Sequence, residues 1–180
     1  MEAMQDSNKL AREFLRISRY QLQERLRRIE LCVAKLDDEQ LWARAHETEN
    51  AVGNLILHLA GNIRQWIVSG VGGAPDRRDR DAEFAQREPL TREQAMSALR
   101  DAIEDADGVL ESLSAEDLLI KRKIQVFELT ALHAIYHCVE HLAEHSGQIV
   151  WATKRMTAED LGIYAYLNDP DRKPPQDLMP

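Results

Sequence analysis

Four of the six histidines lie at intervals of four residues late in the chain, and they are the side chains best suited to chemistry. They are His133, His137, His141 and His145. If this segment is helical, each step of four residues advances about 40° around the axis, so the imidazoles form one row. Neutral imidazole binds zinc, nickel, copper and iron, and neighbours one turn apart can chelate one ion. The spacing therefore predicts a metal site on one helix.

The pair His141 and His145 has the spacing of the HExxH zinc motif but lacks its glutamate, because Leu142 occupies the second position. Glu140 and Glu144 lie to one side of this pair, and either could orient an imidazole or accept a proton. We take Glu144 as the candidate catalytic residue. The alternative is that both carboxylates are surface charges.

A fifth histidine, His58, lies at the border of an apolar helical face in segment 51–69. Its neighbours within about 40° around that helix are polar, namely Asn54, Asn62 and Gln65. A lone histidine at such a border is usually structural. The histidine row later in the chain favours a metal-binding role for His58 instead.

Four segments carry apolar residues at helical spacing and must position these histidines. They are 7–36, 51–69, 91–113 and 130–154, the last two beginning at the caps Thr91 and Thr130. Four such stripes predict an all-α four-helix bundle. The connection of about twenty residues between the second and third helices predicts a crossover or lid. We also expect an extended segment at 121–129 and a short C-terminal helix capped at 157–160.

The composition is that of a folded protein with one core, since 44% of its 180 residues are apolar. We expect one domain at 1–167 and a proline-rich tail at 168–180. The net charge of −8 argues against nucleic-acid binding. No apolar run is long enough to cross a membrane, which favours a cytoplasmic location. Cys32 and Cys138 are expected to be buried free thiols, with a metal-site role for Cys138 as the alternative.

Two stretches of the sequence, Asn54–Asn62 and His137–Ile149, resemble the DinB-like superfamily. The more specific mark is a late helix ending His-x-x-x-His-x-Gly-Gln-Ile, which is matched here by His141, His145, Gly147, Gln148 and Ile149. The other mark is a single histidine midway along the second helix, matched by His58. The resemblance covers nearly the whole chain, and the segments 61–67 and 76–81 look like an uncharacterised branch of the superfamily.

This resemblance implies a four-helix bundle, a homodimer and a divalent metal ion, with zinc, nickel and iron as candidates. The metal ligands that it implies are His58, His141 and His145. His137, Gln148 and Asn62 are expected to lie around these ligands without binding the metal. His133 and His137 extend the histidine pair, so the row offers alternative ligands.

Three imidazoles without a cysteine partner leave coordination positions open, which is typical of catalytic rather than structural zinc. We expect a metal-dependent enzyme that acts on a small molecule. It would be either a transferase whose nucleophile is a low-molecular-weight thiol or a hydrolase. The first alternative is a metal-binding or stress-related structural protein without turnover. The second is a solvated histidine row with no metal.

Overall fold

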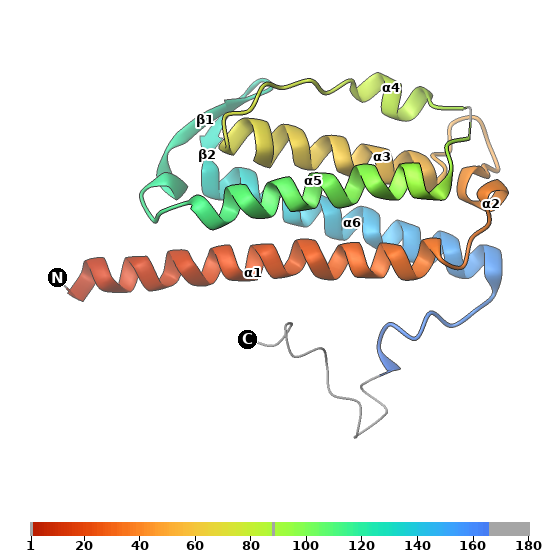
Figure 1. The fold of residues 1–180 in the computed structure, drawn as a ribbon, viewed down its shortest axis with the longest axis horizontal. Coiled ribbons are helices and arrows are strands. Elements are labelled where there is room, and N and C mark those ends of the chain that lie inside the picture. Colours follow the sequence, from red (N-terminus) through yellow and green to blue (C-terminus); the bar gives the residue numbers. More distant parts are fainter. Residues whose placement is uncertain (1, 88, 166–180) are drawn as a thin grey trace.

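Four long helices form the body of the protein in this computed structural model, which describes residues 2–87 and 89–165 (Figure 1). They are α1 (Glu2–Val33), α3 (Val52–Ile63) with its π-helical continuation η1 (Arg64–Val71), α5 (Arg92–Ser112) and α6 (Ala131–Thr157). The shorter elements are α2 (Asp38–Trp42), α4 (Arg80–Ala85), the 3-10 turn η2 (Asp117–Leu119), and the strands β1 (Lys121–Ile124) and β2 (Phe127–Thr130). The predicted all-α four-helix bundle is confirmed, with one small hairpin added to it.

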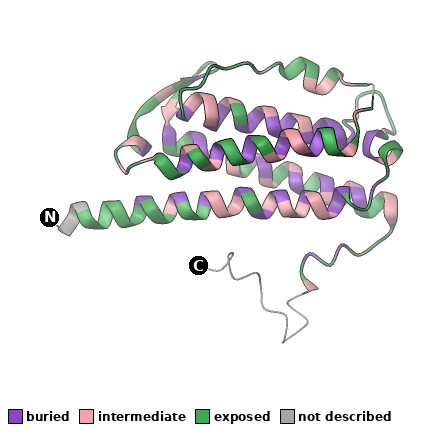
Figure 2. Cartoon of the chain, in the orientation of Figure 1, coloured by how far each residue is buried: buried purple, intermediate pink, exposed green. Residues whose placement is uncertain are grey.

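The second and third long helices, α3 and α5, run in the same direction, so the chain between them must return along the bundle (Figure 1). This is the crossover predicted from the length of the connection. It contains α4, which packs against α3, and most of its residues are exposed (Figure 2). We refer to residues 74–87 as the strap. Helix α1 packs against α5 and α6, and α3 packs against the same two helices.

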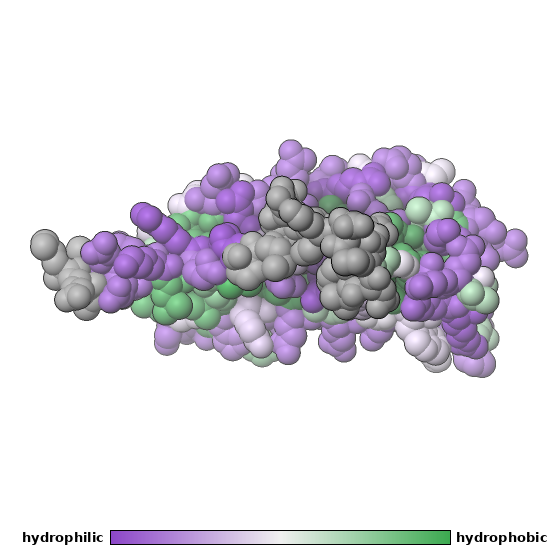
Figure 3. Space-filling view, turned by 90° about the horizontal axis from the view of Figure 1, so that it is seen from below, coloured by the Kyte–Doolittle hydropathy of each residue, from purple (hydrophilic) through white to green (hydrophobic). Residues whose placement is uncertain are grey.

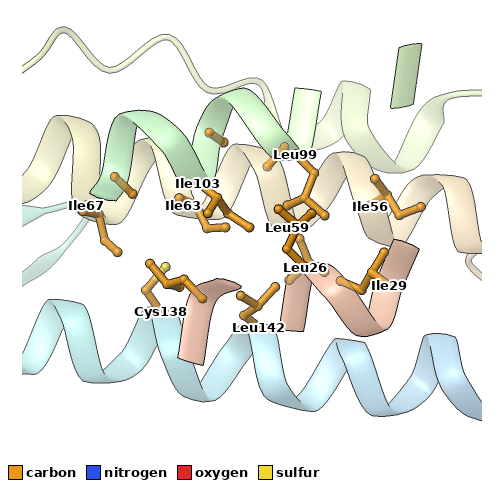
Figure 4. Close-up of a cluster of buried hydrophobic side chains, with 14 of the residues drawn as sticks. Leu26, Ile29, Ile56, Leu59, Ile63, Ile67, Leu99, Ile103, Cys138 and Leu142 are labelled. Atoms are coloured by element: carbon orange, nitrogen blue, oxygen red, sulfur yellow. The ribbon is translucent and has the colours of Figure 1, made fainter. Parts of the chain in front are cut away.

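One hydrophobic core is shared by all four long helices (Figure 4). The residues that meet in it include Leu26 and Ile29 of α1, Ile56, Leu59 and Ile63 of α3, Leu99 and Ile103 of α5, and Cys138 and Leu142 of α6. Full burial of a large aliphatic side chain contributes about 1.5–3 kcal/mol. The bundle therefore has a source of stability that does not depend on a metal. Both cysteines are buried and free, as expected.

Several element boundaries differ from the sequence-based expectation. The first helix begins earlier and ends at Val33 rather than Leu36. The second helix continues past Ser69 to Val71, and its last eight residues form a π-helix. The segment expected to be extended is a two-stranded antiparallel hairpin that pairs Lys121 with Thr130. Its turn contains Gln125 at a φ of 54°. The sequence has no Asn-Gly or Asp-Gly pair here that would predict such a turn.

No helix follows the cap predicted at 157–160 within residues 158–164. Thr157 is the last residue of α6, and its hydroxyl donates a hydrogen bond to the Thr153 carbonyl at 2.9 Å. Ala158 then adopts a left-handed conformation that ends the helix. The proline-rich tail predicted at 168–180 lies outside the described residues. In the described part of the chain, no helix combines the length and apolarity needed to cross a membrane.

Candidate metal centre

Three histidines from two helices converge between α3 and α6. The Nε2 atoms of His58 and His141 are 2.8 Å apart, and one ring nitrogen from each of His58, His141 and His145 lies within 4.8 Å of the others. Three nitrogens that bind one zinc ion at about 2.0–2.1 Å are themselves about 3–3.4 Å apart. The separation of 2.8 Å and the upper bound of 4.8 Å lie on either side of this range, so the three nitrogens have about the spacing that one shared ion needs.

The packing of the two helices explains this convergence. His141 and His145 are one turn apart on α6, so their rings lie side by side with centroids 4.5 Å apart. Helix α3 packs against α6, and Leu59 of α3 and Leu142 of α6 are both fully buried in the shared core, so each helix turns its apolar face inward. His58, one residue before Leu59, then points to the α6 row and is only 4% exposed.

The Nδ1 atom of His58 lies between two charged groups of the strap. It is 2.9 Å from Glu83 Oε2 and 3.1 Å from Arg78 Nη2. When Nδ1–H donates to the carboxylate, the lone pair of Nε2 is free to bind a metal. When Nδ1 instead accepts from the guanidinium, the proton lies on Nε2, where it faces His141. Only the first tautomer of His58 has a lone pair on Nε2, the atom that faces His141.

Glu83 is held in place by a two-point ion pair with Arg78. Arg78 Nε donates to Oε1 at 2.8 Å and Nη2 donates to Oε2 at 2.9 Å, and both side chains are at most 10% exposed. Burial raises the pKa of the Glu83 carboxyl, but the hydrogen bonds from Arg78 and His58 outweigh this effect, so the pKa lies below its ordinary value. The carboxylate is therefore ionised at neutral pH.

The surroundings of the other two histidines also bear on metal binding. His145 Nδ1 lies 2.8 Å from Gln148 Oε1, which accepts its proton in the tautomer whose lone pair is on Nε2. Burial, together with the neighbouring His145 and His58, lowers the pKa of His141 from 6.5 to about 3. Burial likewise lowers the pKa of His58, although the hydrogen bond to Glu83 opposes it. Neutral imidazole is the form of the side chain that binds a metal ion.

The remaining residues predicted around the site lie at different distances from it. His137 packs against Trp66 at 4.1 Å between ring centroids and is stacked at 5.7 Å on His141. Asn62 is buried and accepts a weak hydrogen bond from the Cys138 thiol. Glu144 and His133 are exposed. In the described residues, the metal-capable group of histidines includes neither His133 nor His137.

Sequence reasoning missed the strap residues Arg78, Glu83 and Phe84, the last of which covers His58 at 4.6 Å between ring centroids. No helical period links these residues to His58, because they lie on a separate element. One signal was nevertheless available. Gly61 lies inside the helix that carries His58, and a Cβ at this position would be 1.9 Å from Glu83 Oε1. An unexplained glycine within a helix often marks a close approach of another element.

Comparisons with known proteins agree with this architecture. The crystal structure of a DinB-like protein from Bacillus cereus ATCC 10987 superposes with a TM-score of 0.64, at 16% sequence identity, over 82% of this chain and 93% of that chain. A search of curated proteins found no significant match. The predicted DinB-like fold is thereby confirmed. A model of a family described as a protein of unknown function, DUF1572, matches residues 9–166, and the chain therefore belongs to the DUF1572 family.

Proposed function

We propose that this protein binds a divalent metal ion through His58, His141 and His145 and uses it in the chemistry of a small molecule. The observation that carries the proposal is the convergence of these three ring nitrogens within 4.8 Å, although His58 and His141 are 83 residues apart in sequence. Acceptors for Nδ1–H at two of the three rings support the same conclusion, since both expose Nε2 as a lone-pair donor.

A bound divalent ion would supply a Lewis acid that lowers the pKa of a water molecule or a small thiol. Three imidazole ligands leave room for that group. His141 and His145 are only partly buried, so a small molecule can approach the centre from their side. Glu144, adjacent to His145 and exposed, is our proposed proton acceptor. The reactions that fit are transfer to a low-molecular-weight thiol and hydrolysis.

Activity assays on tag-free protein test the enzymatic part of this proposal. The protein is loaded with zinc, nickel or iron(II) and incubated with small thiols plus electrophiles, and with ester and amide substrates. We expect metal-dependent turnover that is lost in His141→Ala and reduced by about 10²- to 10⁴-fold in Glu144→Gln. Metal binding without turnover on either panel would instead support the non-enzymatic metal-binding alternative.

We also propose that the protein is a homodimer. Helix α1 extends beyond the other helices at its N-terminal end (Figure 1). In Figure 3 the face is largely hydrophilic, but hydrophobic residues are exposed beside this end of the molecule. On α1, Leu10 is 74% exposed and Ile17 is 42% exposed, and burial of such side chains favours association. Light scattering should give about twice the chain mass of 20.6 kDa. A monomer at micromolar concentration would reject this proposal.

A further inference from the structure

The strap is attached to α3 along one stripe of that helix and its continuation η1. The stripe consists of residues spaced four, three and four apart, namely Asn54, His58, Gly61 and Gln65. At one end, the fully buried Asn54 donates to the carbonyls of Glu83 at 2.8 Å and Gln86 at 3.2 Å. At the other end, Gln65 donates to Asp76 and accepts from Arg78. His58 and Gly61 lie between these two ends.

Gly61 provides the space in which the Arg78–Glu83 pair reaches His58. A Cβ on residue 61 would be 1.9 Å from Glu83 Oε1 and 3.2 Å from Arg78 Nε. Any larger residue must therefore displace the carboxylate, and the three atoms nearest to the added Cβ all belong to Glu83 and Arg78. The buried ion pair has a further consequence, since moving either partner leaves the other charge without compensation. The strap and the His58 ring consequently form one unit.

We propose that Glu83 is a positioning residue that selects the metal-binding tautomer of His58, so that closure of the strap and metal binding strengthen each other. This inference rests on the proposed metal site and deepens it. With the strap seated, Glu83 accepts Nδ1–H and leaves Nε2 as a lone-pair donor. Without it, nothing on the strap holds that proton on Nδ1. Because coupling is reciprocal, a metal that favours this tautomer also holds the strap against α3.

The first test measures zinc affinity by competition with a chromogenic chelator. We expect Glu83→Ala to bind zinc about 10- to 100-fold more weakly than wild type, as is usual when the hydrogen-bond partner of a ligating histidine is lost. Glu83→Gln keeps an acceptor oxygen and should fall between the two. Asp81→Ala, which removes an exposed carboxylate from the same short helix, is the control and should bind like wild type.

A glycine pair tests whether the effect passes through Glu83. Gly61→Ala should weaken zinc binding about as much as Glu83→Ala does, and the double variant should show no further loss, because both changes remove one interaction. Gly108→Ala is the matched control, since nothing lies within 4 Å of a Cβ added there. Additive losses in the double variant would refute the route through Glu83. Circular dichroism on each variant checks that the helices are retained, and Glu83→Gln carries the test if Gly61→Ala does not fold.

Limited proteolysis tests the reciprocal effect without any activity assay. The strap carries exposed trypsin sites at Arg77, Arg80 and Arg87. Zinc should slow cleavage at these sites in wild type and in Asp81→Ala, but not in Glu83→Ala at a zinc concentration that saturates it. Equal zinc affinity in wild type and Glu83→Ala, or equal protection of their straps from trypsin, would refute the coupling. Neither result would contradict the metal site itself. A wild-type protein that binds no metal would overturn the metal site itself.

Discussion

Replacement of His145 with alanine should abolish the stabilisation that a divalent metal gives to this protein while leaving the metal-free fold intact. His145 is only partly buried, its ring lies against those of His58 and His141, and it is not one of the buried core residues. The core residues that hold α3 against α6, such as Ile63 and Leu142, are untouched by the change. The substitution therefore removes one of the three nitrogen donors and little else.

The expected size of the effect follows from mass action. A metal that binds only the folded state at 100 times its Kd stabilises the protein by about 2.7 kcal/mol. For a chain of 180 residues, each kcal/mol raises Tm by about 2–4 °C. Wild type should therefore gain about 5–11 °C on addition of zinc at that concentration. His145→Ala should gain almost nothing, and its metal-free Tm should stay within about 4 °C of wild type.

Differential scanning calorimetry on tag-free protein, with and without zinc, measures both quantities. His133→Ala is the control, because it removes an exposed histidine from the same row on the same helix and should keep the full zinc-induced shift. The reasoning fails if His145→Ala retains that shift or if His133→Ala loses it. A collapse of the metal-free Tm in His145→Ala would show that this ring serves the fold rather than a metal.

Two further predictions concern stability. Acidification should destabilise the metal-free protein between about pH 6.5 and pH 3. Burial holds the pKa of His141 near 3 in the folded chain against 6.5 in the unfolded chain, so the unfolded state binds more protons in this window and stability falls as pH falls. Urea unfolding across this range should show a smaller pH dependence in His141→Gln, and an equal dependence would refute this source. Separately, Gly53→Ala should cost about 1–3 kcal/mol because the new Cβ would lie 2.8 Å from the Trp42 ring, whereas Gly108→Ala should be neutral or stabilising by up to about 1 kcal/mol in the same urea assay.

Helical periodicity predicted the histidine row and its face, whereas the choice of His58, His141 and His145 came from the resemblance to the DinB-like superfamily. His141 and His145 are four residues apart, and His58 stands at the edge of an apolar stripe, so their faces could be calculated without knowledge of the tertiary structure. The hydrogen-bond partners of these histidines could be predicted from the sequence only in part. Gln148 is on the same helix as His145, whereas Glu83 reaches His58 from an exposed strap with no period of its own.

The local errors have physical causes of the same kind. The run from Thr157 to Asp160 has the composition of a helix N-terminus, but a threonine hydroxyl can equally bond to the carbonyl four residues before it, as Thr157 does. The hairpin at β1 and β2 has no Asn-Gly or Asp-Gly turn, so its alternation predicted an extended segment without a reversal. In both places the residue types allow two conformations equally well, and the packing or the local backbone determines which of them forms.

Elemental analysis of tag-free protein tests the central claim most directly. Wild type and the double variant His141→Ala/His145→Ala would each be incubated with zinc, nickel or iron(II), passed through a desalting column and analysed for metal per chain. The three-histidine site predicts about one equivalent of a divalent metal in wild type and a small fraction of that in the double variant. Wild type that retains none of the three metals, or a double variant that retains as much as wild type, would contradict it.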